Sequence, residues 1–345
     1  PILGGSTLAF LVAWNAWTPP RHAPRQPEQA APADTEPLPL ADDPAGRREP
    51  VLDPAMEPEE GAPLGPVPPP ERRPGLDALI DVIAPIALEA PVSGDAALAA
   101  LPATRRVGSK PFAVEGLNAA SGHWEAPHAG QRYTAFQAGV QLANRTGALN
   151  EIEFSEFVVK TQAYADALNG TPEFPEMRSG VARARELHQS AGAHDAQLSF
   201  PLRARSAAWS PGYVQQHAAR LGFIAGSIPG RMVLPASQAG APPVLVLSFD
   251  TQAALAEDPT QAALLELSLS VDVPQVPRSE QPYLRMREAA AALGTSMDGL
   301  LTDGNGHLLR PEALDAIGTD LEQLYDTLDA RDLSAGSPQA RRLFS

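Results

Sequence analysis

The sequence contains no cysteine, and only two of its 26 basic residues, Lys110 and Lys160, are lysine. Without cysteine the chain has no disulfide, no thiol nucleophile and no iron–sulfur or cysteine-ligated zinc site, and it could belong in cytosol or periplasm. The formal net charge of −15 repels phosphate polymers, and no run rich in Lys and Arg offsets it locally. We therefore expect no nucleic-acid partner.

Motifs of the common enzyme classes are also missing. The sequence has no G-x-G-x-x-G after a strand pattern, no Walker loop, no G-x-S-x-G and no H-E-x-x-H. The closest approach to a metal cluster is His123, Glu125 and His128, which we interpret as a solvated loop. The segment 303–306 lacks the later ligands of a calcium loop and predicts a hairpin turn. We expect no enzymatic activity, no metal, no cofactor and no small-molecule substrate.

Proline is concentrated in one part of the chain. Of the 37 prolines, 17 lie between Pro19 and Pro74, in a stretch without hydrophobic periodicity. Such a stretch has too little apolar surface to offset the loss of chain entropy on folding. Residues 18–75 are therefore predicted to be a disordered spacer, partly polyproline II, and an SH3-type ligand is the less favoured interpretation.

Residues 1–17 carry no charge and begin at Pro1 rather than Met. As a helix they would span about 26 Å of the roughly 30 Å hydrocarbon core, so we predict a truncated transmembrane helix. Trp14 and Trp17 fit an interfacial belt, and Arg21 and Arg25 soon after place the rest of the chain in the cytoplasm. The alternative is a secretory signal peptide, although no basic n-region or nearby cleavage site is visible.

The rest of the chain, 76–194 and 195–345, shows one order of strand and helix signals twice. In chain order the pairs are strands at 77–82 and 195–200, helix starts at Ser93 and Ser210, strands at 151–154 and 265–271, and helices at 175–189 and 282–293. Serine is a preferred N-cap, and Pro211 suits the first helical position. We predict two tandem, related α+β units. In this alignment residues 195–202 are both the last strand of the first unit and the first strand of the second. Either the two units share that edge strand, or the first unit lacks its last strand.

The second unit has the clearer pattern. Its elements follow the order β-α-β-β-β-α-β-β-α, which predicts an antiparallel sheet with helices on one face and the other face free. Period-two alternation in 244–249 is expected to turn Val244 and Val246 toward the helices. That facing would leave Leu245, Leu247 and Phe249 on the uncovered face.

Several strings of the second unit resemble the C-terminal domain of the ZipA family, membrane-anchored bacterial division proteins that bind FtsZ. These strings are ARLGFIAG at 219–226, VDVP at 271–274, and MDGLLTD at 297–303 with RPEAL at 310–314. The similarity covers roughly 195–331, and the predicted anchor and proline-rich spacer match the family's layout. The resemblance implies a split β-α-β fold and a degenerate ZipA-like first unit in 76–194.

In that family the uncovered sheet face holds a shallow apolar groove for the FtsZ tail. Carried over by position, the partner-binding residues would be Ile228, Met232, Leu245, Leu247 and Phe249. The sequence departs from the family at four positions expected on the same outer face, where the family tends to be apolar. These are Gln197, Ser199, Ser268 and Ser270.

The resemblance implies a single-pass inner-membrane protein with a cytoplasmic domain that binds FtsZ at the division site. The alternative is a divisome or envelope scaffold that keeps the ZipA-like fold but no longer binds the FtsZ tail. A third interpretation is a periplasmic binding module, which would apply if the N-terminus were a cleaved signal.

Overall fold

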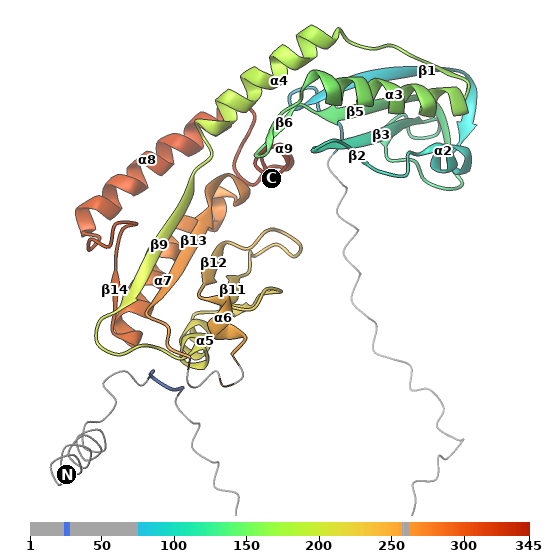
Figure 1. Ribbon diagram of the computed structural model, residues 1–345. Helices are drawn as coiled ribbons and strands as arrows, with labels where there is room; N and C mark the ends of the chain where they lie inside the picture. Colours follow the sequence, from blue (N-terminus) through green and yellow to red (C-terminus); the bar gives the residue numbers. More distant parts are fainter. Residues whose placement is uncertain (1–23, 28–74, 257, 259–261) are drawn as a thin grey trace, which may run out of the picture. The chain divides into compact units, whose positions relative to one another are not determined.

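The computed structural model describes residues 24–27, 75–256, 258 and 262–345 (Figure 1). The predicted membrane helix and most of the predicted spacer lie outside these residues. In the described part, no helix combines the length and hydrophobicity needed to cross a bilayer. This part is built from antiparallel sheets and helices, which confirms the α+β class.

The first half contains an antiparallel sheet in the order β2-β3-β5-β1-β8, with β4 paired to β3. Its strands are β1 (Asp81–Ser93), β2 (Arg106–Val107), β3 (Lys110–Asn118), β4 (Trp124–Glu125), β5 (Arg132–Gln141) and β8 (Gly170–Pro172). Its other elements are the helices α2 (Gly94–Ala100), α3 (Glu151–Ala167) and α4 (Met177–Gly192), and the hairpin of β6 (Ala143–Asn144) and β7 (Gly147–Ala148). Ile86 of β1 and its cross-strand partner Phe136 enter one core with Phe157 of α3.

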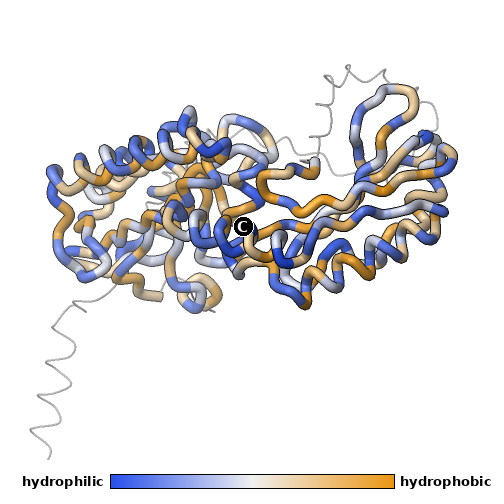
Figure 2. Tube along the Cα trace, turned by 90° about the horizontal axis from the view of Figure 1, so that it is seen from above, coloured by the Kyte–Doolittle hydropathy of each residue, from blue (hydrophilic) through white to orange (hydrophobic). Residues whose placement is uncertain are grey.

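The second half contains a six-stranded antiparallel sheet in the order β10-β11-β12-β13-β9-β14. Its strands are β9 (Gln197–Ala204), β10 (Ile224–Ala225), β11 (Arg231–Leu234), β12 (Leu245–Ser248), β13 (Glu266–Asp272) and β14 (Gly299–Leu301). Its helices are α5 (Pro211–Arg220), α6 (Thr251–Ala254), α7 (Pro282–Met297), α8 (Pro311–Asp329) and α9 (Pro338–Leu343), with 3₁₀ turns η1 (Val273–Gln275) and η2 (Arg278–Glu280). Along many elements hydrophobic and hydrophilic residues alternate, as expected when one side is buried (Figure 2).

The local signals at helix ends and turns are confirmed. The Ser93 side chain accepts a hydrogen bond from the backbone of the first turn of α2, and Ser210 does the same for α5, which begins at Pro211. In the predicted hairpin turn, Gly306 N donates to Asp303 O over 3.0 Å. Each of these structures needs partners only a few residues away, so a short window of sequence suffices to predict it.

The strand predicted at 151–154 is wrong, because these residues form the first turn of α3. Asn150 caps the helix and forms a capping box with Glu153, whose carboxylate accepts from Asn150 N. The alternation over four residues misled the prediction. Over a longer window, Phe154, Phe157, Thr161 and Tyr164 recur at helical spacing and are all buried in this structure.

The strand that opens each half occupies an equivalent place in its sheet. β1 lies between β5 and β8, which are the last strand of that sheet before α3 and the first one after it; the β6–β7 hairpin comes between β5 and α3 in the chain. β9 lies between β13 and β14, the strands before and after α7. β9 belongs to the second sheet alone, so the described sheets share no strand and the first one ends at β8.

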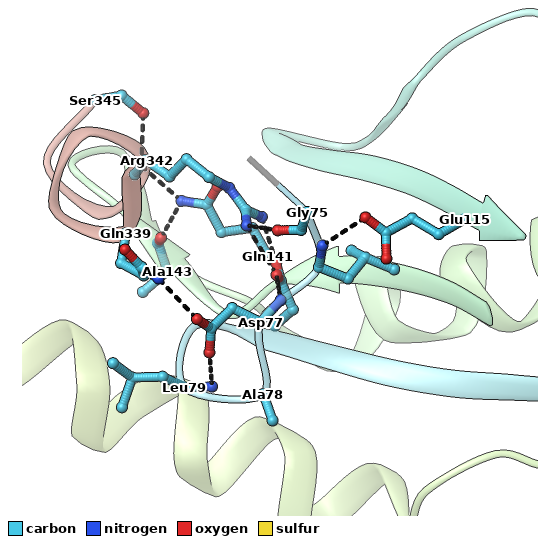
Figure 3. A network of polar contacts seen from close by, with 12 residues as sticks. Gly75, Asp77, Ala78, Leu79, Glu115, Gln141, Ala143, Gln339, Arg342 and Ser345 are labelled. Carbon is cyan, nitrogen blue, oxygen red and sulfur yellow. Dashed lines mark hydrogen bonds and ion pairs between the residues drawn. The ribbon is translucent and has the colours of Figure 1, made fainter. Parts of the chain in front are cut away.

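The C-terminal helix α9 is fastened to the start of the first sheet by a buried ion pair. The guanidinium of Arg342 donates to both carboxylate oxygens of Asp81, over 2.5 and 2.9 Å, and the Asp81 side chain is 0% exposed. Gln141 donates to the carbonyl of Arg342, and Gln339 donates to Asp77 (Figure 3). The end of the chain is therefore part of the packing around β1.

The same C-terminal residues also bond to the second half. The Gln275 side chain of η1 donates to the carbonyl of Phe344 over 2.7 Å. Arg145, in the β6–β7 turn, forms ion pairs with Asp195, which precedes β9, and with Asp272, the last residue of β13. Polar contacts at α9 and at Arg145 thus connect elements of both halves.

We expect Arg342→Met to destabilise the protein by about 3–5 kcal/mol at neutral pH, because it leaves the Asp81 carboxylate buried without its counter-charge. Burial already raises the pKa of Asp81, and the bonds from Arg342 oppose that shift. Without Arg342 the pKa should rise further. The folded state then binds a proton more tightly than the unfolded state, so the loss of stability should grow as the pH rises through that pKa.

Urea unfolding at pH 5 and pH 8 measures this difference. Arg185→Met is the matched control, because it removes an arginine from an exposed pair with Glu151, whose side chain is 58% exposed. The control should cost less than about 1 kcal/mol at either pH. A small loss for Arg342→Met that does not change with pH would show that the Asp81–Arg342 pair is not a significant constraint.

Candidate interaction surface

The two faces of the second sheet are defined by its register. Met232, Leu247, Leu269 and Phe200 are successive cross-strand partners from β11 to β9, so their side chains share one face. The Phe200 ring packs against Tyr283 of α7 with 6.3 Å between ring centroids. This face is therefore the one that the helices cover.

The predicted facing of β12 is wrong. Met232, Leu245, Leu247 and Phe249 are 5%, 0%, 0% and 8% exposed and lie in the core. Of the five residues carried over from the family, only Ile228, in the turn before β11, is exposed, at 52%. These four side chains cannot line a groove on the open face.

Apolar residues on both sides of β12 explain the error. Val246 faces away from Leu245 and Leu247, so alternation of polarity gives no sign of which set is core. The neighbouring strand carries the missing signal, because Val246 pairs with Ser270. A serine on β13 marks the open face, and the pairing transfers that facing to Val246.

The open face is mostly small and polar. The register places on it the four residues predicted there, which are Gln197, Ser199, Ser268 and Ser270. The hydroxyls of Ser199 and Ser268 lie 2.6 Å apart, and Arg203 pairs with Glu266 over 2.7 Å. These polar groups bond to one another across the strands, so this part of the face offers little apolar surface to a ligand.

One row of the open face is apolar, and sequence analysis missed it. Ile224 of β10 pairs with Val233, and Val233 pairs with Val246, so the three side chains form a cross-strand row. We call this the Ile224 row. Val233 and Val246 are half-buried, whereas Ile224 is 55% exposed on a terminal strand of the described sheet. Ile228, in the turn that follows, is also exposed.

The segment around His123 is arranged by hydrogen bonds within the protein. Glu125 of β4 accepts from the Asn118 side chain over 2.7 Å and from the Tyr133 hydroxyl over 3.1 Å. Burial, together with the hydroxyl's bond to Glu125, raises the pKa of Tyr133, and the bond from His128 N opposes that rise. Within residues 24–27, 75–256, 258 and 262–345, no group of three or more acidic or histidine side chains is placed to hold a metal ion.

Comparison of the sequence with protein-family models and with curated proteins found no match.

Leu247→Ala should destabilise the fold by about 2–5 kcal/mol, because it opens a cavity in the core beneath the helices. Ile228→Ala is the matched control at the exposed member of the predicted groove and should change stability by no more than about 0.5 kcal/mol. Chemical denaturation of the two variants compares them directly. Equal stability of both would mean that Leu247 is not a core residue.

Proposed function

We propose that this chain is a membrane-tethered bacterial division protein of the ZipA type that binds FtsZ on the open face of its second sheet. The observation that carries the proposal is the Ile224 row, an apolar row on a mostly small and polar face, which begins on a terminal strand of the described sheet. Exposed apolar side chains at such a position are typical of peptide-binding surfaces. The site is thus on the face expected for the family, but on different residues.

The positions of the similar strings support this proposal. The string 219–226 spans the end of α5 and β10, and 271–274 spans the end of β13 and η1. The string 297–303 spans the end of α7 and β14, and 310–314 begins α8. All of them lie at ends of elements, where turn geometry restricts the sequence most. The shared place of β1 and β9 in their sheets supports our further proposal that the two halves are related, with the first as a degenerate copy.

The Ile224 row is small, and this sets the expected affinity. Burying one partly exposed aliphatic side chain contributes about 1–2 kcal/mol before ordering costs, so a single FtsZ tail would bind weakly. Many tethered copies facing a polymer of repeated tails raise the effective concentration and hence the avidity. Anchoring in the inner membrane with the folded part in the cytoplasm, as proposed from residues 1–25, suits that arrangement.

A second candidate function is a divisome or envelope scaffold that no longer holds the FtsZ tail. The bonded serines and the Arg203–Glu266 pair on the open face favour it, because they replace apolar surface that a tail would need. The two candidates differ in one measurable property, which is binding of FtsZ polymers that carry their tails.

Co-sedimentation of the full chain with FtsZ polymers tests the proposal. Wild type should sediment with FtsZ but not with FtsZ lacking its tail. Ile224→Ser should weaken binding about five- to thirtyfold, which corresponds to about 1–2 kcal/mol. Ile152→Ser is the matched control, because Ile152 lies on α3 in the first half and is 81% exposed. This variant should bind FtsZ as wild type does.

Two results would argue against the proposal. No sedimentation of wild type with tailed FtsZ would favour the scaffold, and equal binding by Ile224→Ser and Ile152→Ser would place the site elsewhere.

A reporter fused to the C-terminus tests the membrane topology. A reporter that works only in the cytoplasm should be active when fused there. The reason is that Arg21 and Arg25 follow the predicted membrane helix, and positive charges favour the cytoplasmic side. Activity of a reporter that works only in the periplasm would instead favour the periplasmic binding module.

A further inference from the structure

A short segment of the predicted spacer is bound to the second half of the protein. Residues 24–27, drawn as a short blue segment in Figure 1, lie next to the loop before α5. Arg25 N donates to Ala208 O over 2.6 Å, and Ser210 N donates to Arg25 O over 2.9 Å. These bonds form a parallel bridge between Arg25 and Trp209. At these residues the structure differs from the disorder predicted for 18–75.

The bridge adds the segment to a ladder that already exists. Trp209 also pairs antiparallel with Leu264 through two backbone hydrogen bonds. Arg25 therefore takes the free side of Trp209, the arrangement by which an extended peptide is captured through its main chain. The ring of Pro27 lies close to Gly212 at the start of α5.

The guanidinium of Arg25 is bound by three hydrogen-bond acceptors. It donates to the carbonyl of Met297 and to the carboxylate of Asp298, each over 2.9 Å, and to the Ser206 hydroxyl over 3.2 Å. Met297 is the last residue of α7, so the positive charge lies at the negative end of that helix dipole. The same carbonyl accepts from the indole of Trp209, which is fully buried.

Asp298 is held in place without Arg25. It caps α7 in the left-handed conformation, with φ 55° and ψ 51°, and its carboxylate accepts from Ser206 over 2.6 Å. The bond from Ser206, followed by the bond and the positive charge of Arg25, lowers the pKa of Asp298. A charged acceptor thus stands ready at the place where the arginine binds.

We propose that Trp209, Met297 and Asp298 form a binding site for an extended Pro-Arg-x-Pro peptide, occupied in this chain by its own residues 24–27. Main-chain pairing at Trp209 selects an extended peptide, and the carboxylate with the helix end selects arginine. The forked guanidinium suits this pair of acceptors better than the single ammonium of lysine.

Binding of the segment changes how far the folded part can extend from its tether. If residues 1–17 form the proposed membrane anchor, seven residues separate it from Arg25 and span at most about 25 Å. Without this contact the first described residue of the fold is Gly75, and 57 residues could span up to roughly 190 Å. This consequence rests on the proposed anchor, whereas the peptide site itself does not.

Titration of a fluorescein-labelled peptide of residues 22–29 with the full chain tests the site by anisotropy. Arg25→Ala frees the site, so this variant should bind the peptide at least tenfold more tightly than wild type, whose own segment competes at high effective concentration. Arg21→Ala makes the same charge change four residues earlier and should bind as wild type does. Adding Asp298→Asn to Arg25→Ala should abolish the gain in peptide affinity. Asparagine is chosen because it tolerates the left-handed backbone at this position.

The indole resonance of Trp209 gives a second readout that needs no peptide. It should shift in Arg25→Ala and remain in place in Arg21→Ala, because Arg25 shares the Met297 carbonyl with that indole. Equal peptide binding by wild type and Arg25→Ala, or no binding by either up to millimolar concentration, would overturn the proposal. A wild-type dimer that Arg25→Ala converts to monomer would show that the segment comes from a second copy.

Discussion

The buried pair of Asp81 and Arg342 is the constraint on which the rest of the fold depends. A carboxylate that is 0% exposed is costly to bury without a positive charge beside it, so the native packing of β1 and that of the last helix stabilise each other. Ile80 and Leu343 pack in one small cluster beside this pair, so the apolar and polar contacts agree. The first strand and the last helix are therefore coupled in stability, although they are far apart in the chain.

The structures that could be predicted from sequence are those whose hydrogen-bonding partners are close in the chain. The caps at Ser93 and Ser210 and the turn at Asp303 depend on groups two to four residues away, and each was predicted correctly. The ion pairs that join distant parts gave no such signal. Arg342 is 261 residues from Asp81, and no local pattern distinguishes it from the adjacent Arg341.

The candidate site shows the same limit in a subtler form. Serines on β13 correctly indicated the open face, because a polar side chain on one side of a strand leaves no doubt about which side is core. β12 has leucines on one side and a valine on the other, so its facing depends on its register with β13. That register depends on residues far apart in the chain. The prediction used the sequence of β12 alone, and it therefore assigned the core side and the exposed side of this strand the wrong way round.

The two proposed binding sites use different parts of the second sheet. The Ile224 row begins on β10, whereas Asp298 immediately precedes β14, the strand at the other end of the strand order. Five strand spacings of about 4.8 Å separate these positions by roughly 24 Å. The arginine bound at Asp298 and the exposed Ile224 are therefore at opposite ends of the strand order. If both proposals hold, the peptide site at Asp298 and the proposed partner site at Ile224 are separate, and binding of residues 24–27 would set the reach of the fold without using Ile224.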